Sequence, residues 1–106
     1  MKPAPVVLIT GAAAGIGLAT ALAFARAGYR IVGTDLKAES GPALLAAVQA
    51  AGAEVRYLAA DHAREADTVA AVHLALEAFG RLDVAVARVD RYKRLIDFRP
   101  ADDSAV

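Results

Sequence analysis

Three glycines in the segment TGAAAGIG, residues 10–17, stand where a backbone could hold an anion. Gly11 lets the chain turn sharply after an apolar run, Gly15 lets the backbone approach a pyrophosphate without a Cβ in the way, and Gly17 allows a helix to pack closely on a strand. The free N–H groups of the helix start and the positive end of its dipole would then face the phosphates. Glycines also serve ordinary turns, but this context predicts a dinucleotide cradle.

An acidic residue stands where such a ligand needs one. Asp35 lies 18 residues beyond Gly17, at the end of a second apolar run, and its carboxylate can accept hydrogen bonds from both ribose hydroxyls of an adenosine. The same carboxylate repels a 2'-phosphate, so NAD is favoured, while the nearby Lys37 keeps NADP as the less favoured alternative. Asp61, just after a third apolar run, could receive the adenine amino group; the alternative, a solvated loop carboxylate, stays open.

The other polar residues predict no further chemistry. His62 follows a strand end, but no second ligand lies at metal spacing, so we expect no metal site. His73 lies beside an apolar helical stripe and is expected to be packed and hydrogen-bonded. The stripe consists of Val69, Val72, Leu76 and Phe79. Ser40 is expected to be the N-cap of a helix. The chain has no cysteine, which excludes disulfides and thiolate chemistry.

Four short apolar runs alternate with longer helical patterns. Strands are predicted at residues 6–10, 30–34, 54–59 and 82–87, and helices at 15–27, 42–51 and 65–79. Each helix is followed by Gly28, Gly52 or Gly80, where a helix end needs a positive φ. Because the runs are continuously apolar, we expect parallel strands covered on both faces and joined by right-handed crossovers. The fold class is α/β.

The composition is that of a folded protein. The 106 residues are 58% apolar with a formal net charge of zero, so we expect a single domain and no bulk electrostatic binding to nucleic acid. No apolar run approaches the roughly 20 residues of a membrane span, and the first residues do not form a signal peptide. We therefore expect a cytoplasmic protein without a membrane partner.

These residues resemble the short-chain dehydrogenase/reductase family, whose glycine motif has the spacing TGxxxGxG. The resemblance continues through GTDL at 33–36, Asp61 and FGRLDV at 79–84, and covers roughly residues 5–86. It implies a three-layer Rossmann-like parallel sheet with strand order 3-2-1-4, truncated after the fourth strand, with NAD across the carboxyl ends of the strands. The pyrophosphate would lie at the glycines and Ile16, the ribose at Asp35 and the adenine at Asp61. The expected cofactor-binding residues are Thr10, Gly11, Gly15, Ile16, Gly17, Asp35, Leu36 and Asp61.

The chain departs from the family at two places. After the fourth strand the family carries Asn-Asn-Ala-Gly, which lines the cofactor, whereas residues 87–90 are Ala-Arg-Val-Asp. The family's chemistry uses a serine after a fifth strand and a tyrosine four residues before a lysine, because one helical turn puts that lysine beside the tyrosine and lowers its pKa. Here Tyr92 and Lys93 are adjacent and would point about 100° apart on a helix. We therefore assign no catalytic residue.

Three functions follow as hypotheses. The first is an NAD(H)-binding Rossmann module of an oxidoreductase of this family, able to bind NAD or mainly its ADP-ribose half but catalytically incomplete. The second is part of an active NAD-dependent dehydrogenase whose serine, tyrosine and lysine come from further sequence or a partner chain. The third is a non-enzymatic interaction fragment that has lost the ligand. Whether the chain is an enzyme stays open.

The end of the chain carries two further expectations. Residues 1–106 are expected to be one partial dinucleotide-binding domain, with an altered or loosely packed segment at 88–106. The fourth strand would lack its usual outer neighbour, and an apolar strand edge invites pairing with another chain. We therefore expect a tendency to form a homodimer through this edge.

Overall fold

Four parallel strands form one sheet in the computed structural model, which describes residues 3–87. The strands are β1 (Val6–Thr10), β2 (Arg30–Asp35), β3 (Val55–Ala59) and β4 (Val84–Val86), in the order β3-β2-β1-β4. The predicted strand order and α/β class are therefore confirmed. The helices are α1 (Gly15–Arg26), α2 (Gly41–Ala50) and α3 (Glu65–Phe79), with a short 3-10 helix, η1 (Ala38–Ser40), before α2.

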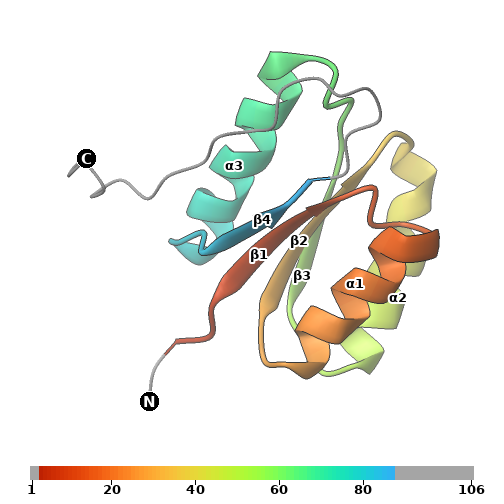
Figure 1. Ribbon diagram of the computed structural model, residues 1–106, viewed down its shortest axis with the longest axis vertical. Coiled ribbons are helices and arrows are strands. Elements are labelled where there is room, and N and C mark those ends of the chain that lie inside the picture. The colour runs from red at the N-terminus through yellow and green to blue at the C-terminus, as the bar shows by residue number, and fades with distance from the viewer. Residues whose placement is uncertain (1–2, 88–106) are drawn as a thin grey trace.

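The sheet lies between two helical layers (Figure 1), with α1 and α2 on one face and α3 on the other. Neighbouring side chains of a strand point to opposite faces, so β1 contributes to both cores. Val7 and Ile9 pack with Leu44 of α2 on one side, while Val6 and Leu8 pack against the α3 layer. All five residues of β1 are buried, as expected for a central strand covered on both faces.

The outer strands differ from the prediction. β3 is only partly buried, with Val55 buried and Arg56 exposed, and β4 has only three residues, with Ala85 exposed. Leu82 and Asp83 precede β4 instead of belonging to it. Continuous burial holds for β1 and for Ile31 to Thr34 of β2, because only these inner strands have sheet neighbours on both sides within residues 3–87.

The expected apolar stripe of α3 is also wrong in part. Val69 and Leu76 are 59% and 48% exposed, and the side chains that face the sheet are Ala71, Ala75 and Phe79. Small alanines let a helix lie close to a sheet, so they occupy the buried face.

Two single-residue predictions change with this arrangement. His73 is not packed: its side chain is 67% exposed and its Nδ1 lies 3.9 Å from a Glu77 carboxylate oxygen. Ser40 precedes α2 but makes no side-chain capping hydrogen bond. The glycines after the helices do behave as predicted, with φ of 95° at Gly28, 90° at Gly52 and 78° at Gly80.

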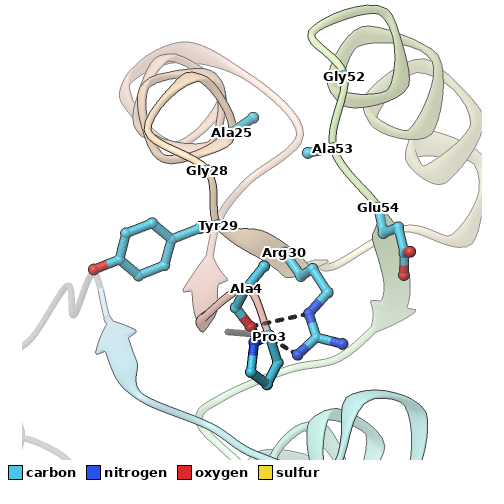
Figure 2. Close-up of a pocket in the computed structure, with 9 residues that line it drawn as sticks. All are labelled: Pro3, Ala4, Ala25, Gly28, Tyr29, Arg30, Gly52, Ala53 and Glu54. Carbon is cyan, nitrogen blue, oxygen red and sulfur yellow. Dashed lines mark hydrogen bonds between the residues drawn. The ribbon is translucent and has the colours of Figure 1, made fainter. Parts of the chain in front are cut away.

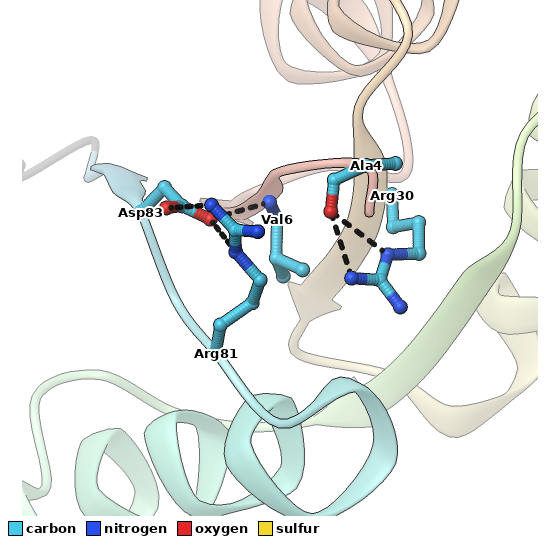
Figure 3. Close-up of polar contacts among 5 residues, drawn as sticks. All are labelled: Ala4, Val6, Arg30, Arg81 and Asp83. Atoms are coloured by element: carbon cyan, nitrogen blue, oxygen red, sulfur yellow. Dashed lines mark hydrogen bonds and ion pairs between the residues drawn. The ribbon is translucent and has the colours of Figure 1, made fainter. Parts of the chain in front are cut away.

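A charged cluster of Arg81 and Asp83 joins the N-terminal end of β4 to that of β1 (Figure 3). We call this cluster the clamp. The Asp83 carboxylate accepts the Val6 backbone N–H at 2.9 Å and two hydrogen bonds from the Arg81 guanidinium at 2.8 and 2.9 Å. The hydrogen bonding from Arg81 has the largest effect, and together with the bond from Val6 it holds the pKa of Asp83 below its usual value. The clamp fixes where β4 begins beside β1.

Candidate functional site

The carboxyl ends of the strands gather the predicted site residues at one edge of the sheet. Thr10 pairs in register with Thr34, and Asp35 with Ala59, so the glycine loop, Asp35 and the segment at Asp61 begin side by side. Two backbone hydrogen bonds extend these pairings, from the Ala12 N–H to the Thr34 carbonyl at 2.9 Å and from the Ala60 N–H to the Asp35 carbonyl at 2.8 Å. In open α/β sheets this edge is where ligands bind.

The glycine loop has the geometry that its sequence predicts. Gly11 and Gly15 have φ of 64° and 58°, a backbone conformation that disfavours side chains. A Cβ on Gly15 would meet no atom within 4 Å, so its α-carbon faces open space. A Cβ on Gly17 would lie 1.8 Å from the Gly11 carbonyl oxygen. The third glycine therefore allows α1 to start directly against the turn that follows β1.

The start of α1 is left without polar side chains. Ala14, the N-cap residue, offers no capping group, and the first turn contains no acidic residue. The backbone N–H of Leu18 is bonded to the Ala14 carbonyl at 3.3 Å, and the N–H groups before it belong to the first turn, which has no intrahelical acceptor. These donors and the helix dipole favour an anion at this place.

Asp35 is held against the glycine loop. One carboxylate oxygen, Oδ2, accepts the backbone N–H of Ala13 at 3.0 Å, and the other, Oδ1, accepts that of Leu36 at 2.9 Å. This contact brings the carboxylate to the residue just before Ala14, the N-cap of α1. Each oxygen keeps further lone pairs that can accept hydroxyl groups.

Two large apolar side chains beside these groups are open to solvent. Ile16 is 71% exposed and Leu36 is 68% exposed, although both lie next to well-packed elements. Ile16 follows Gly15, and Leu36 follows Asp35. Apolar surface at the carboxyl ends of strands, next to backbone N–H groups that suit a phosphate and next to a carboxylate, is typical of a ligand site.

The segment after β2 is anchored by a residue that the sequence did not single out. The Tyr57 hydroxyl of β3 donates to the Lys37 carbonyl at 2.5 Å. Burial, followed by the charges of Asp35 and Glu39, raises the Tyr57 pKa above its ordinary value. The Tyr57 ring lies where a Cβ on Gly41 would come within 2.6 Å of it. Tyr57 thus sets the path of the chain directly after Asp35.

Asp61 lies in a tight loop between β3 and α3. Its Oδ1 accepts the Ala63 N–H at 2.9 Å, and its own N–H donates to Asp67 Oδ2 at 2.8 Å. Its Oδ2 has no hydrogen-bond partner among residues 3–87, so one oxygen is available to a ligand. Between the same two elements, the His62 ring contacts the hydroxyls of Thr34 and Thr68.

Some predicted features fall outside the described residues. Ala87 is described, but the rest of the altered loop, Arg88 to Asp90, is not, and neither is the pair Tyr92 and Lys93. Within the described part of the chain, no group of three metal-ligating side chains could hold a metal ion. No helix in that part is long and apolar enough to cross a membrane.

A cavity of about 310 Å³ lies at the opposite edge, where β2 and β3 begin (Figure 2). The Arg30 guanidinium lines this cavity and donates hydrogen bonds from Nε and Nη2 to the Ala4 carbonyl, at 3.2 and 2.7 Å. The same guanidinium lies 4.9 Å from the centre of the Phe79 ring. Arg56 lies 5.0 Å from the same ring. These contacts hold the N-terminal segment and the end of α3, so we assign this edge a structural role.

Known proteins are similar to this chain in both sequence and fold. The family model described as short chain dehydrogenase matches residues 5–96. An A-factor type gamma-butyrolactone 1'-reductase from Streptomyces virginiae is 44% identical over 80 residues, which are 76% of this chain and 31% of that protein.

Solved structures agree. A crystal structure of NAD+-bound xylitol dehydrogenase superimposes with a TM-score of 0.73 at 34% identity, covering 78% of this chain and 32% of the other. A short chain dehydrogenase/reductase from Burkholderia phymatum in complex with NAD has the same TM-score and identity, with coverages of 78% and 30%. The chain thus spans about a third of the length of the relatives that it matches. The match over most of its residues, together with the glycine loop and strand order, shows that the chain belongs to the short-chain dehydrogenase family.

Proposed function

We propose that the chain is the NAD(H)-binding Rossmann module of a short-chain dehydrogenase/reductase-type oxidoreductase, with a preference for NAD over NADP. The observation that carries the proposal is the hydrogen bond from the Ala13 N–H to Asp35 Oδ2. It joins the carboxylate that would hold a ribose to the loop that would hold the phosphates. NAD in the structures of two relatives supports the same ligand.

The described residues fit the two ends of an ADP-ribose. The N–H groups at Gly15, Ile16 and Gly17 would bind the pyrophosphate, because this helix start has no side-chain cap and no acid in its first turn. Thr10, at the end of β1, and Gly11 form the turn below them. When bound, NAD would supply the hydride acceptor of the family's reaction, while these residues hold and orient it.

The adenosine half would lie across the neighbouring strand ends. Asp35 would accept the ribose hydroxyls, Leu36 would cover the sugar and base with its exposed side chain, and the free oxygen of Asp61 would accept the adenine amino group. A 2'-phosphate would meet the Asp35 carboxylate at short range, which disfavours NADP.

A titration of the full chain with NAD, ADP-ribose and NADP tests the proposal. We expect NAD and ADP-ribose to bind with similar affinity, because the described groups contact the ADP-ribose half, and NADP to bind more weakly. At 100 times its Kd, NAD should raise the free energy of unfolding by about 2.7 kcal/mol. An unchanged melting temperature at saturating NAD would refute the proposal and favour the non-enzymatic interaction fragment.

Whether a complete reaction occurs is a separate proposal. The second candidate, an active dehydrogenase with catalytic residues from further sequence or a partner chain, is favoured by the threefold greater length of the relatives. It predicts that the gene product in its source cell is longer than 106 residues and oxidises or reduces alcohols and ketones with NAD(H). If the natural gene product has this length and is inactive on alcohols and ketones, the binding module is favoured.

We also infer a homodimer through β4. Within residues 3–87, β4 pairs with β1 alone, and Ala85 is exposed. An unpaired parallel strand can accept a second chain along its backbone. Light scattering should show mass above that of the 10.9 kDa monomer as concentration rises; a constant monomer mass would exclude this dimer.

A further inference from the structure

One imidazole joins three elements beside the proposed adenosine site. The His62 Nε2 lies 2.8 Å from the Thr34 hydroxyl of β2, and its Nδ1 lies 2.9 Å from the Thr68 hydroxyl of α3. Thr34 is fully buried and directly precedes Asp35. His62 directly follows Asp61. The ring therefore connects the neighbours in sequence of the two carboxylates that would hold an adenosine.

The other hydrogen bonds of this loop are mostly local. Asp61 bonds Ala63 and Asp67, and the Arg64 N–H donates to the Asp61 carbonyl at 2.8 Å. They fix the shape of the loop and its place on α3. Toward β2, the pairing of β3 ends at Asp35 and Ala59, and beyond it the described residues provide the backbone bond from Ala60 to Asp35 and the His62 side chain. Without the ring, the loop beyond the end of the β2–β3 pairing would have no bond to β2 after Ala60 among the described residues.

We propose that His62 is a positioning residue of the dinucleotide site, which holds Asp61 at the separation from Asp35 that the adenosine half of NAD requires by bridging Thr34 and Thr68. This inference rests on the proposed function and extends it to a residue that touches no ligand. It gives a role to a half-buried histidine that has both ring nitrogens bonded to hydroxyls and, among the described residues, does not belong to a group of three metal-ligating side chains.

The neutral form of the His62 ring suits this bridge. A neutral imidazole has one N–H and one lone pair, so one threonine donates to the ring and the other accepts from it. A charged ring has two N–H groups and cannot accept, so the hydroxyl that donated to the ring must turn its hydrogen to another acceptor, which disturbs the bridge. Burial lowers the pKa of His62 below its ordinary value, against the opposing charges of Asp67 and Asp61.

The remaining surroundings of the ring carry no charge. The small cavity beside it is lined from β1, α3 and β4 by uncharged side chains. These are Leu8, Thr10, Thr68, Val72, Leu82, Ala85, Val86 and Ala87. Asp67 and Asp61 are therefore the charged groups that bear on His62 among the described residues. Since its pKa is lowered, the ring is neutral above about pH 6.5 and gains its charge only as the pH falls through the folded-state pKa.

Calorimetric titration of the full chain with NAD and with AMP tests this role. His62→Val removes both hydrogen bonds and should weaken NAD and AMP binding about tenfold at pH 7.5, as the loss of one to two positioning bonds predicts. His62→Gln, whose amide has a donor and an acceptor, should restore binding to within about threefold. Thr68→Val, which removes only the α3 side, should weaken binding by an intermediate factor.

The pH profile separates positioning from general loss of structure. Wild-type affinity for AMP should fall as the pH is lowered from 7.5 through the folded-state pKa of His62, which lies below its ordinary value, and His62→Gln should lack this component. His73→Gln is the control, because His73 is exposed on α3 and makes no such bridge; it should keep the wild-type affinity and profile.

The outcomes distinguish the two proposals. If wild type binds neither NAD nor AMP, the proposed function fails and this inference fails with it. If wild type binds and His62→Val binds equally well, or Thr68→Val and His62→Gln keep the full pH dependence, His62 has no positioning role. If His62→Val does not fold, the Thr68→Val and His62→Gln titrations decide by the same criteria.

Discussion

Gly17 is the position where an added methyl group should be most damaging. In Gly17→Ala the new Cβ would lie 1.8 Å from the Gly11 carbonyl oxygen, where real Cβ atoms stay beyond 3.0 Å, so the start of α1 must retreat by more than 1 Å. The obstacle is backbone, which cannot turn aside. Alanine is also a better helix residue than glycine by about 1 kcal/mol, but overpacking costs about 1–3 kcal/mol, with its upper end applying here. The net destabilisation should be about 2 kcal/mol.

Urea denaturation followed by circular dichroism measures this loss. With a slope of about 1 kcal/mol per molar urea for a small domain, the midpoint should fall by about 2 M. Gly15→Ala is the matched control: its Cβ enters open space, and its cost comes from the positive φ alone, about 1 kcal/mol. We expect Gly17→Ala to lose both stability and NAD affinity, and Gly15→Ala to lose mainly affinity. A Gly17→Ala midpoint equal to wild type, or above that of Gly15→Ala, would refute the close approach of α1 to the turn.

Three further changes probe the strand ends. Asp35→Ala should weaken NAD binding about tenfold or more and narrow the gap to NADP, since it removes a charged acceptor worth about 1.5–3 kcal/mol; calorimetry with both dinucleotides measures this, and equal values to wild type would remove Asp35 from the site. Asp83→Asn should lower the free energy of unfolding by about 1 kcal/mol at pH 7. Because Arg81 lowers the Asp83 pKa, the wild-type advantage should be present above about pH 4 and vanish as the pH falls through the folded-state pKa; an advantage that does not change with pH in urea denaturation would contradict this. Tyr57→Phe should cost about 1 kcal/mol and loosen the segment at Lys37, detectable as faster amide hydrogen exchange there; unchanged exchange would show that the hydroxyl does not anchor it.

The glycine loop and Asp35 could be predicted from the sequence because their roles depend on local backbone geometry. A positive φ at Gly11 and Gly15 and a close contact at Gly17 follow from the order of strand, turn and helix. Asp35 stands at a strand end, so the parallel register alone brings it to the loop. The strand order followed from the family resemblance, and the structure confirms it.

Other features depended on contacts that no local pattern shows. His62 and Thr34 are 28 residues apart, and nothing near either one indicates that they meet. On α3, large apolar residues and alanines both recur with helical spacing, so the sequence did not determine which of the two faces the sheet. Ala71 and Ala75 pack against the sheet, because their small size permits a close approach, and Val69 and Leu76 remain exposed.

The starts of the three helices explain why an anion would bind at α1 and not elsewhere along the same edge. In α3 the first turn contains Glu65 and Asp67, whose charges offset the helix dipole and repel a phosphate. The start of α2 has Glu39 just before it and Pro42 within its first two positions, which removes one backbone donor. The start of α1 has neither an acid nor a capping side chain. The Asp35 carboxylate is bonded to the Ala13 N–H, which precedes the N-cap, so it lies beside the donors of α1 at the place where a ribose would follow the phosphates.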